Sequence, residues 1–164
     1  MKKLLILVLV AGFGITLVSG QQNRSGLSPL LSLYYDIKND LVKADAAETS
    51  IKATGFLNVI NGIDDKTLTA AENSVFSSLK EKLAMDAKHI SEEREISKQR
   101  DHFKTFSDNF YLLAKETRLS PEPVYQLFCP MKKSYWLSNE AVVKNPYYGN
   151  QMLTCGKITD TLKP

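Results

Sequence analysis

The chain has 164 residues, of which 43% are hydrophobic and 24% charged, and its formal net charge is +3. This length suits one domain with a sizeable core and argues against two. The near balance of acidic and basic residues excludes a strongly basic, nucleic-acid-binding protein. After residue 20, no segment is long and apolar enough to cross a bilayer.

Residues 1–20 are typical of a cleavable secretion signal. Lys2 and Lys3 supply a positive start, residues 4–18 are apolar, and small residues precede Gln21. A retained membrane anchor is the alternative, but the run contains two glycines and falls short of the roughly 20 apolar residues that a bilayer requires. We expect a periplasmic or secreted, soluble domain of residues 21–164, with 19 basic and 18 acidic residues once Lys2 and Lys3 are removed.

Two amphipathic helices are expected in the first third of the domain. Ser28 is a candidate N-cap with Pro29 at the first helical position, and apolar residues then recur at spacings of three and four. Asp45 and Glu48 have the form of a capping box, so a second helix starts there or continues the first with a bend. The predicted buried residues are Leu30, Tyr34, Ile37, Leu41 and Ala44 in the first helix and Ala47, Ile51 and neighbours up to Ile60 in the second.

Two further helices complete an expected antiparallel four-helix bundle over about residues 28–118. Thr69 and Glu72 form another capping box ahead of the third helix. The fourth is expected from Ser91 to about Thr117. The apolar stripes are Ala71, Val75, Leu79, Leu83, Ala87 and Ile90 in the third helix and Ile96, Gln99, Phe103, Phe106, Phe110 and Leu113 in the fourth.

A small lobe over about residues 121–162 is expected to follow the bundle, because Pro121 and Pro123 stop the helical pattern. Residues 124–128 and 134–137 are rich in β-branched and aromatic side chains, which predicts a short β-hairpin. Residues 145–149 are typical of a turn, and residues 151–154 of a single helical turn ended by Gly156.

Both cysteines and two of the four methionines fall in two short strings, residues 129–131 and 152–155. Extended residues two apart point to one side of the chain, and helical residues three apart share a face. If the two strings face each other, four sulfurs surround one point. Thiolate and thioether ligands favour monovalent copper or silver, so the candidate metal ligands are Cys129, Met131, Met152 and Cys155.

A disulfide between Cys129 and Cys155 is the competing interpretation, and spacing alone favours it, because paired cysteines in an oxidising compartment are usually joined. Such a bond would stabilise the fold by about 3 to 4 kcal/mol, with Met131 and Met152 as ordinary core residues. The two states can also interconvert, with metal bound only to reduced thiols.

The remaining candidate residues give weaker signals. His89 and His102 fall on the third and fourth helices, where a lone histidine is more often a surface residue than a ligand. Arg100, Ser107 and Tyr111 form either a buried polar network or a solvated flank of the aromatic stripe. No zinc-protease, nucleophile-elbow, phosphate-loop or dinucleotide motif occurs, so we do not expect an enzyme.

Four stretches of the C-terminal lobe resemble a known protein family. These stretches are Val124-Tyr-Gln-Leu-Phe-Cys-Pro-Met131, Tyr135-Trp-Leu-Ser138, Asn145-Pro-Tyr-Tyr-Gly149 and Met152-Leu-Thr-Cys-Gly156. With Gln99-Arg100 and Phe103, Ser107 and Tyr111 of the fourth helix, they resemble a bacterial family of exported proteins known as domain of unknown function thirty-three forty-seven. One departure is that many relatives have a longer insertion between the Cys-Pro-Met and Trp-Leu-Ser strings, so the hairpin should be tighter here.

The resemblance implies a function, because members of this family also occur as the C-terminal extension of periplasmic adaptor subunits of copper and silver efflux pumps. It implies a module that binds monovalent copper or silver and works with such an adaptor. Aromatic residues would then shield the metal, namely Tyr135, Trp136, Tyr147 and Tyr148. The alternative is a disulfide-stabilised structural or protein-interaction domain without metal.

Overall fold

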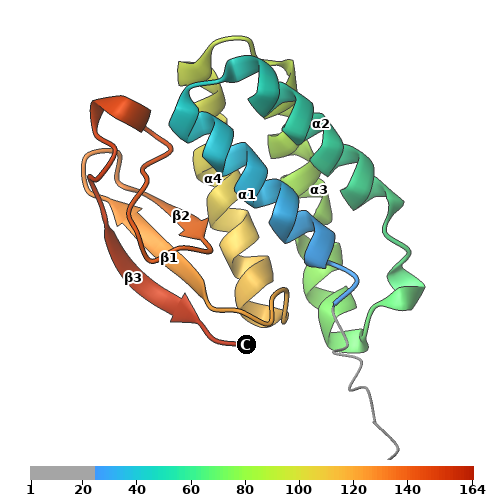
Figure 1. The fold of residues 1–164 in the computed structure, drawn as a ribbon. Coiled ribbons are helices and arrows are strands. Elements are labelled where there is room, and N and C mark those ends of the chain that lie inside the picture. Colours follow the sequence, from blue (N-terminus) through green and yellow to red (C-terminus); the bar gives the residue numbers. More distant parts are fainter. Residues whose placement is uncertain (1–24) are drawn as a thin grey trace, which may run out of the picture.

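The computed structural model describes residues 25–164 and contains four contacting α-helices followed by a small three-stranded antiparallel sheet (Figure 1). This confirms the predicted fold class. The expected signal segment, residues 1–20, lies outside the described residues. The elements are α1 Ser28–Lys43, α2 Ala46–Gly62, the 3-10 turn η1 Asp65–Thr67, α3 Ala70–Glu92, α4 Ile96–Glu116, β1 Val124–Cys129, β2 Ser134–Ser138, the 3-10 turn η2 Gly149–Gln151 and β3 Lys157–Leu162.

The helix starts follow the capping signals, with two corrections. Thr69 and Glu72 form the full capping box of α3, and the Asp45 side chain accepts from the N–H of Glu48 at 3.0 Å to begin α2. Ser28 is not the N-cap of α1. It is the first helical residue, and its hydroxyl donates to the carbonyl of Leu119 at 2.9 Å instead.

The predicted start of the fourth helix at Ser91 is also wrong, because α3 continues to Glu92 and α4 begins at Ile96. The buried face of α2 differs from the prediction as well, with Ala47 exposed and Ile51 59% exposed. The buried face of α2 begins instead with Thr49 and Ser50. The Ser50 hydroxyl donates to the carbonyl of Glu93, the C-cap residue of α3. Small hydroxyl side chains can therefore start a buried face when they bond to backbone.

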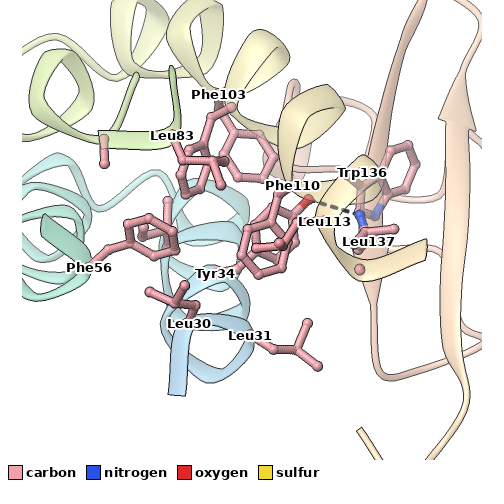
Figure 2. Close-up of a cluster of buried hydrophobic side chains, with 14 of the residues drawn as sticks. Leu30, Leu31, Tyr34, Phe56, Leu83, Phe103, Phe110, Leu113, Trp136 and Leu137 are labelled. Carbon is pink, nitrogen blue, oxygen red and sulfur yellow. Dashed lines mark hydrogen bonds between the residues drawn. The ribbon is translucent and has the colours of Figure 1, made fainter. Parts of the chain in front are cut away.

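An aromatic cluster fills the centre of the helical part (Figure 2). The Tyr34 ring of α1 stacks on Phe110 of α4 with centroids 4.6 Å apart, and Phe56 of α2 meets Phe106 edge-on at 4.9 Å. Phe103 adds a third ring from α4 and is fully buried. The predicted stripe of α4 is therefore the face that holds the other helices.

The C-terminal lobe is a sheet with strand order β2-β1-β3, and β2 packs against α4 (Figure 1). The hairpin of β1 and β2 is confirmed, with Cys129 opposite Ser134. A third strand, β3, was not predicted and pairs with β1 on its other edge. Within residues 25–164, no helix is long and apolar enough to cross a membrane.

The Tyr34 hydroxyl joins β2 to α1 and α4. The Tyr34 hydroxyl accepts from the N–H of Leu137 in β2 at 2.9 Å (Figure 2). It also hydrogen-bonds with Ser107 of α4 at 2.6 Å. All three residues are buried. The sheet is therefore fixed to the helices by a polar contact within the apolar core.

Candidate functional site

Cys129 is the last residue of β1, and its side chain is fully buried. Its sulfur accepts hydrogen bonds from the side-chain amide of Asn145 at 3.1 Å and from the N–H of Lys132 at 3.4 Å. Both donors come from turns rather than from regular structure. These two N–H groups hold the Cys129 sulfur in place at the end of β1.

Cys155 lies beside Cys129, in the segment between η2 and β3, and is half-buried. Burial raises the pKa of the Cys155 thiol, and the charge of Cys129 and a hydrogen bond with it raise that pKa further. The backbone N–H of Met131 acts in the opposite direction and lowers the pKa of this thiol. The structure thus brings together the two cysteines from strings that are 26 residues apart in sequence (155 minus 129).

Both cysteines are free thiols, so the disulfide that the sequence favours is not formed in this structure. Within residues 25–164, no group of three or more His, Cys, Asp or Glu side chains is placed to hold a metal ion. A metal at the two thiols would therefore draw any further ligand from thioether, amide or backbone groups.

The two methionines lie close to the thiols in the chain but are exposed, Met131 by 61% and Met152 by 38%. The predicted extended geometry of residues 129–131 is wrong, because the strand stops at Cys129 and residues 130–133 form the hairpin turn, with Lys133 at φ 53°. Residues 152–155 form a turn in which the N–H of Cys155 donates to the carbonyl of Met152 at 3.0 Å. Cys129 is therefore positioned by the end of β1, and Cys155 by a turn.

Asn145 organises the site, and the sequence analysis did not single it out. Its fully buried amide donates to the Cys129 sulfur and, at 2.7 Å, to the carbonyl of Cys155. Its side-chain oxygen accepts from the N–H of Tyr147 at 2.8 Å, and its own N–H donates to the carbonyl of Leu153. One side chain therefore fixes both sulfur strings. The signal in the sequence was the Asn-Pro pair of the 145–149 turn.

Aromatic side chains enclose the inner side of the site. Trp136 and Tyr147 are buried and meet edge-on with centroids 6.2 Å apart, and the Tyr147 hydroxyl donates to the carbonyl of Tyr135. Gly156, at φ 155°, leaves room for Trp136, because a Cβ there would lie 2.6 Å from the indole Cη2. The backbone after Cys155 therefore runs directly against the indole, and Cys155 is the more exposed of the two cysteines.

The residues predicted as a polar edge on α4 serve three separate contacts. Arg100 donates to the carbonyl of Leu41 at 2.8 Å, and burial lowers the pKa of its guanidinium. Ser107 bonds to Tyr34, and the Tyr111 hydroxyl donates to Asp160 of β3 at 2.7 Å. These contacts tie α4 to α1 and to the sheet, which is a structural role. His89 and His102 lie apart from the thiols, on α3 and α4.

Comparison with known proteins shows which family the chain belongs to. No curated protein and no solved structure matches the chain. The sequence model of one family, described as "Protein of unknown function (DUF3347)", matches residues 30–122. This match runs from the third residue of α1 through α4 and ends just before β1, so the two sulfur strings lie beyond it. Because more than half of the chain is matched, the chain belongs to the DUF3347 family.

Proposed function

We propose that this protein is a periplasmic or secreted module that binds monovalent copper or silver at Cys129 and Cys155, with thioether ligands from Met131 and Met152. The observation that carries the proposal is that the Asn145 amide bonds both to the Cys129 sulfur and to the carbonyl of Cys155, which holds the two cysteines together, one buried and one half-buried. Thiolate and thioether sulfurs are the ligands that select soft monovalent ions. The donor set thus suits copper(I) and silver(I) better than magnesium or calcium.

Uptake of the ion exchanges protons for metal. The two S–H bonds break, two metal–sulfur bonds form, and both protons pass to solvent while the ion keeps its single positive charge. The hydrogen bonds from Asn145 and Lys132 to the Cys129 sulfur orient it as a ligand. Cys155 is the residue that an arriving ion meets first, because it is less buried than Cys129.

The methionines are suited to a supporting role. A methionine side chain has three rotatable bonds, so an exposed thioether can turn toward an ion held between nearby thiolates. Met131 adjoins the site in the hairpin turn two residues after Cys129, and Met152 adjoins it through its carbonyl, which accepts from the N–H of Cys155. Trp136 and Tyr147 then limit access of water and oxidant from the inner side.

The proposed partner is a periplasmic adaptor subunit of a heavy-metal efflux pump. The support is the resemblance of the four C-terminal stretches to a family that also occurs as an extension of such adaptors, together with the signal-like residues 1–20. Transfer to a partner needs an accessible ligand, and the exposed side chain of Met131 at the tip of the hairpin supplies one.

A second candidate function is a structural or protein-interaction domain in which the cysteines are joined. The attachment of both cysteines to the Asn145 amide favours it as well, because thiols held close together need little movement to oxidise. Intact-mass analysis of protein taken directly from the periplasm separates the two functions. A mass two hydrogens short in every molecule supports the disulfide, whereas free thiols support the metal module.

A competition titration of the reduced protein with monovalent copper against a chromophoric chelator tests the thioether part of the proposal. Met131→Leu and Met152→Leu should each weaken binding by about tenfold, because leucine keeps the volume and removes the sulfur. Met85→Leu is the matched control, since Met85 is 55% exposed on α3, away from the thiols. Equal affinity in the parent and the double Met131/Met152 variant would remove the thioethers from the site.

A further inference from the structure

The chain's two histidines meet across a helix pair. His89 lies in the last turn of α3 and His102 in the second turn of α4, and their ring centroids are 4.9 Å apart with an interplanar angle of 46°. The ring planes are too inclined for a parallel stack. His89 is exposed and His102 is half-exposed, so both rings are open to ions in solution.

The register that brings the two rings together is set by Asp86, one helical turn before His89. The Asp86 carboxylate accepts from Thr105 at 2.8 Å and from Asn109 at 3.0 Å, both on α4. These hydrogen bonds fix α3 and α4 relative to each other and already occupy the carboxylate. The two imidazoles therefore stand as a pair on rigid elements, which gives a more precise site than loops do.

The spacing of the rings matches a shared metal ion. Imidazole nitrogens bind divalent ions at about 2.1 Å, and with the ring centroid about 1.1 Å behind the nitrogen each centroid lies about 3.2 Å from the ion. Two such centroids 4.9 Å apart subtend about 100° at the ion, between the octahedral and tetrahedral angles. Rotation of the two exposed rings is enough to direct a nitrogen of each toward that point.

We infer that His89 and His102 form a second metal site, a two-imidazole chelate for a borderline divalent cation of the copper, nickel or zinc class. Imidazole suits these ions, whereas the thiol pair suits soft monovalent ones. Water fills the remaining coordination positions, because within residues 25–164 no third His, Cys, Asp or Glu side chain joins the pair. The negative end of the α3 dipole adds an attraction for the cation.

Nickel is the probe of choice, because it binds imidazole and does not oxidise the thiols. Calorimetric titration of tag-free, full-length protein with nickel chloride should show one ion per chain. His89→Gln and His102→Gln should each weaken binding by at least about tenfold, since one imidazole no longer chelates. Cys155→Ser should bind nickel as the parent does, which separates this site from the thiol site.

Thermal unfolding gives a second readout. A ligand that bridges α3 and α4 stabilises the folded state, so millimolar nickel should raise the Tm of the parent and of Cys155→Ser but not of His89→Gln. His89 is exposed, so its substitution leaves the core intact and the variant should fold. The inference is overturned if the parent does not bind nickel at millimolar concentration, or if either histidine variant binds as tightly as the parent.

Discussion

The Asn145 amide nitrogen lies 3.1 Å from the Cys129 sulfur, and both side chains are fully buried. The same nitrogen reaches the carbonyl of Cys155 at 2.7 Å, so one amide connects the end of β1 to the segment before β3. The thiol pair therefore depends on a residue that lies outside both sulfur strings.

Replacement of Asn145 by alanine should destabilise the fold by about 1 to 3 kcal/mol, because it leaves the Cys155 carbonyl and the Tyr147 N–H without this partner in a buried setting. Copper affinity should fall by about tenfold as well, since supporting hydrogen bonds orient metal ligands. Urea unfolding and the chelator competition measure the two effects. Asn139→Ala, at an exposed position between β2 and the 145–149 turn, should change neither.

The Tyr34 hydroxyl is predicted to stabilise the contact between the helices and the sheet. Tyr34→Phe removes the acceptor of the Leu137 N–H and the partner of Ser107, all inside the core, and should cost about 1 to 3 kcal/mol. Tyr35→Phe is the matched control, because Tyr35 is only partly buried and its hydroxyl takes part in no hydrogen bond with the described residues. Equal denaturation midpoints for the two variants would contradict this assignment.

Much of the helical part follows from local rules. Thr69 and Glu72 mark the start of α3, and the phenylalanines of α4 mark its buried face, because caps and periodicity act within a few residues. The error at Ile51 has a physical reason. The buried face of α2 begins with Thr49 and Ser50, whose hydroxyls bond to the carbonyls of Asp45 and Glu93, so hydrophobicity alone points to the wrong side.

The candidate site could be predicted less well from capping and periodicity. β3 carries only Ile158 and Leu162 as apolar residues and has a mostly exposed surface, so its pairing with β1 has no local signal. The contact of Asn145 with Cys129 and that of His89 with His102 both depend on how elements pack. The two sulfur strings stand out in the sequence because both cysteines and two methionines concentrate there, but the geometry of the turn after Cys129 and of the turn before Cys155 was not predictable from it.

The burial of Lys38 should make the free energy of unfolding depend on pH. Its side chain is buried in α1, and that burial lowers the pKa of its amine from 10.5 to about 8, with Glu140 acting to raise it and Lys144 to lower it. Between about pH 8 and 10.5 the unfolded chain therefore binds more protons than the folded one, so this lysine makes stability rise with pH. Below about pH 8 both states are protonated, and the cost of burying the charge is fully present.

Lys38→Met should consequently be more stable than the parent at pH 7, by about 1 to 3 kcal/mol, and this advantage should shrink as the pH approaches 10.5. Urea unfolding at a series of pH values gives the difference directly. Lys98→Met on the exposed side of α4 is the control and should show a pH-independent offset near zero. A Lys38→Met advantage that stays constant from pH 7 to 10.5 would contradict the prediction.

Gly156 is predicted to be required for the fold of the C-terminal lobe. A Cβ there would lie 2.6 Å from Trp136 Cη2 and 3.1 Å from the carbonyl oxygen of Phe128, at a φ of 155° that disfavours side chains. Gly156→Ala should cost about 2 kcal/mol or more. Gly62→Ala, where a Cβ would meet nothing within 4 Å, should be neutral or stabilising. Equal unfolding free energies for the two variants would show that Trp136 moves aside freely.

The most direct test of the proposed metal site is X-ray absorption at the copper edge of reduced protein loaded with one equivalent of monovalent copper. We expect a first coordination shell made of sulfur alone, and we expect Cys155→Ser to fail to retain the ion on a desalting column. A shell dominated by nitrogen or oxygen, or full retention of copper by Cys155→Ser, would contradict a thiol site at Cys129 and Cys155.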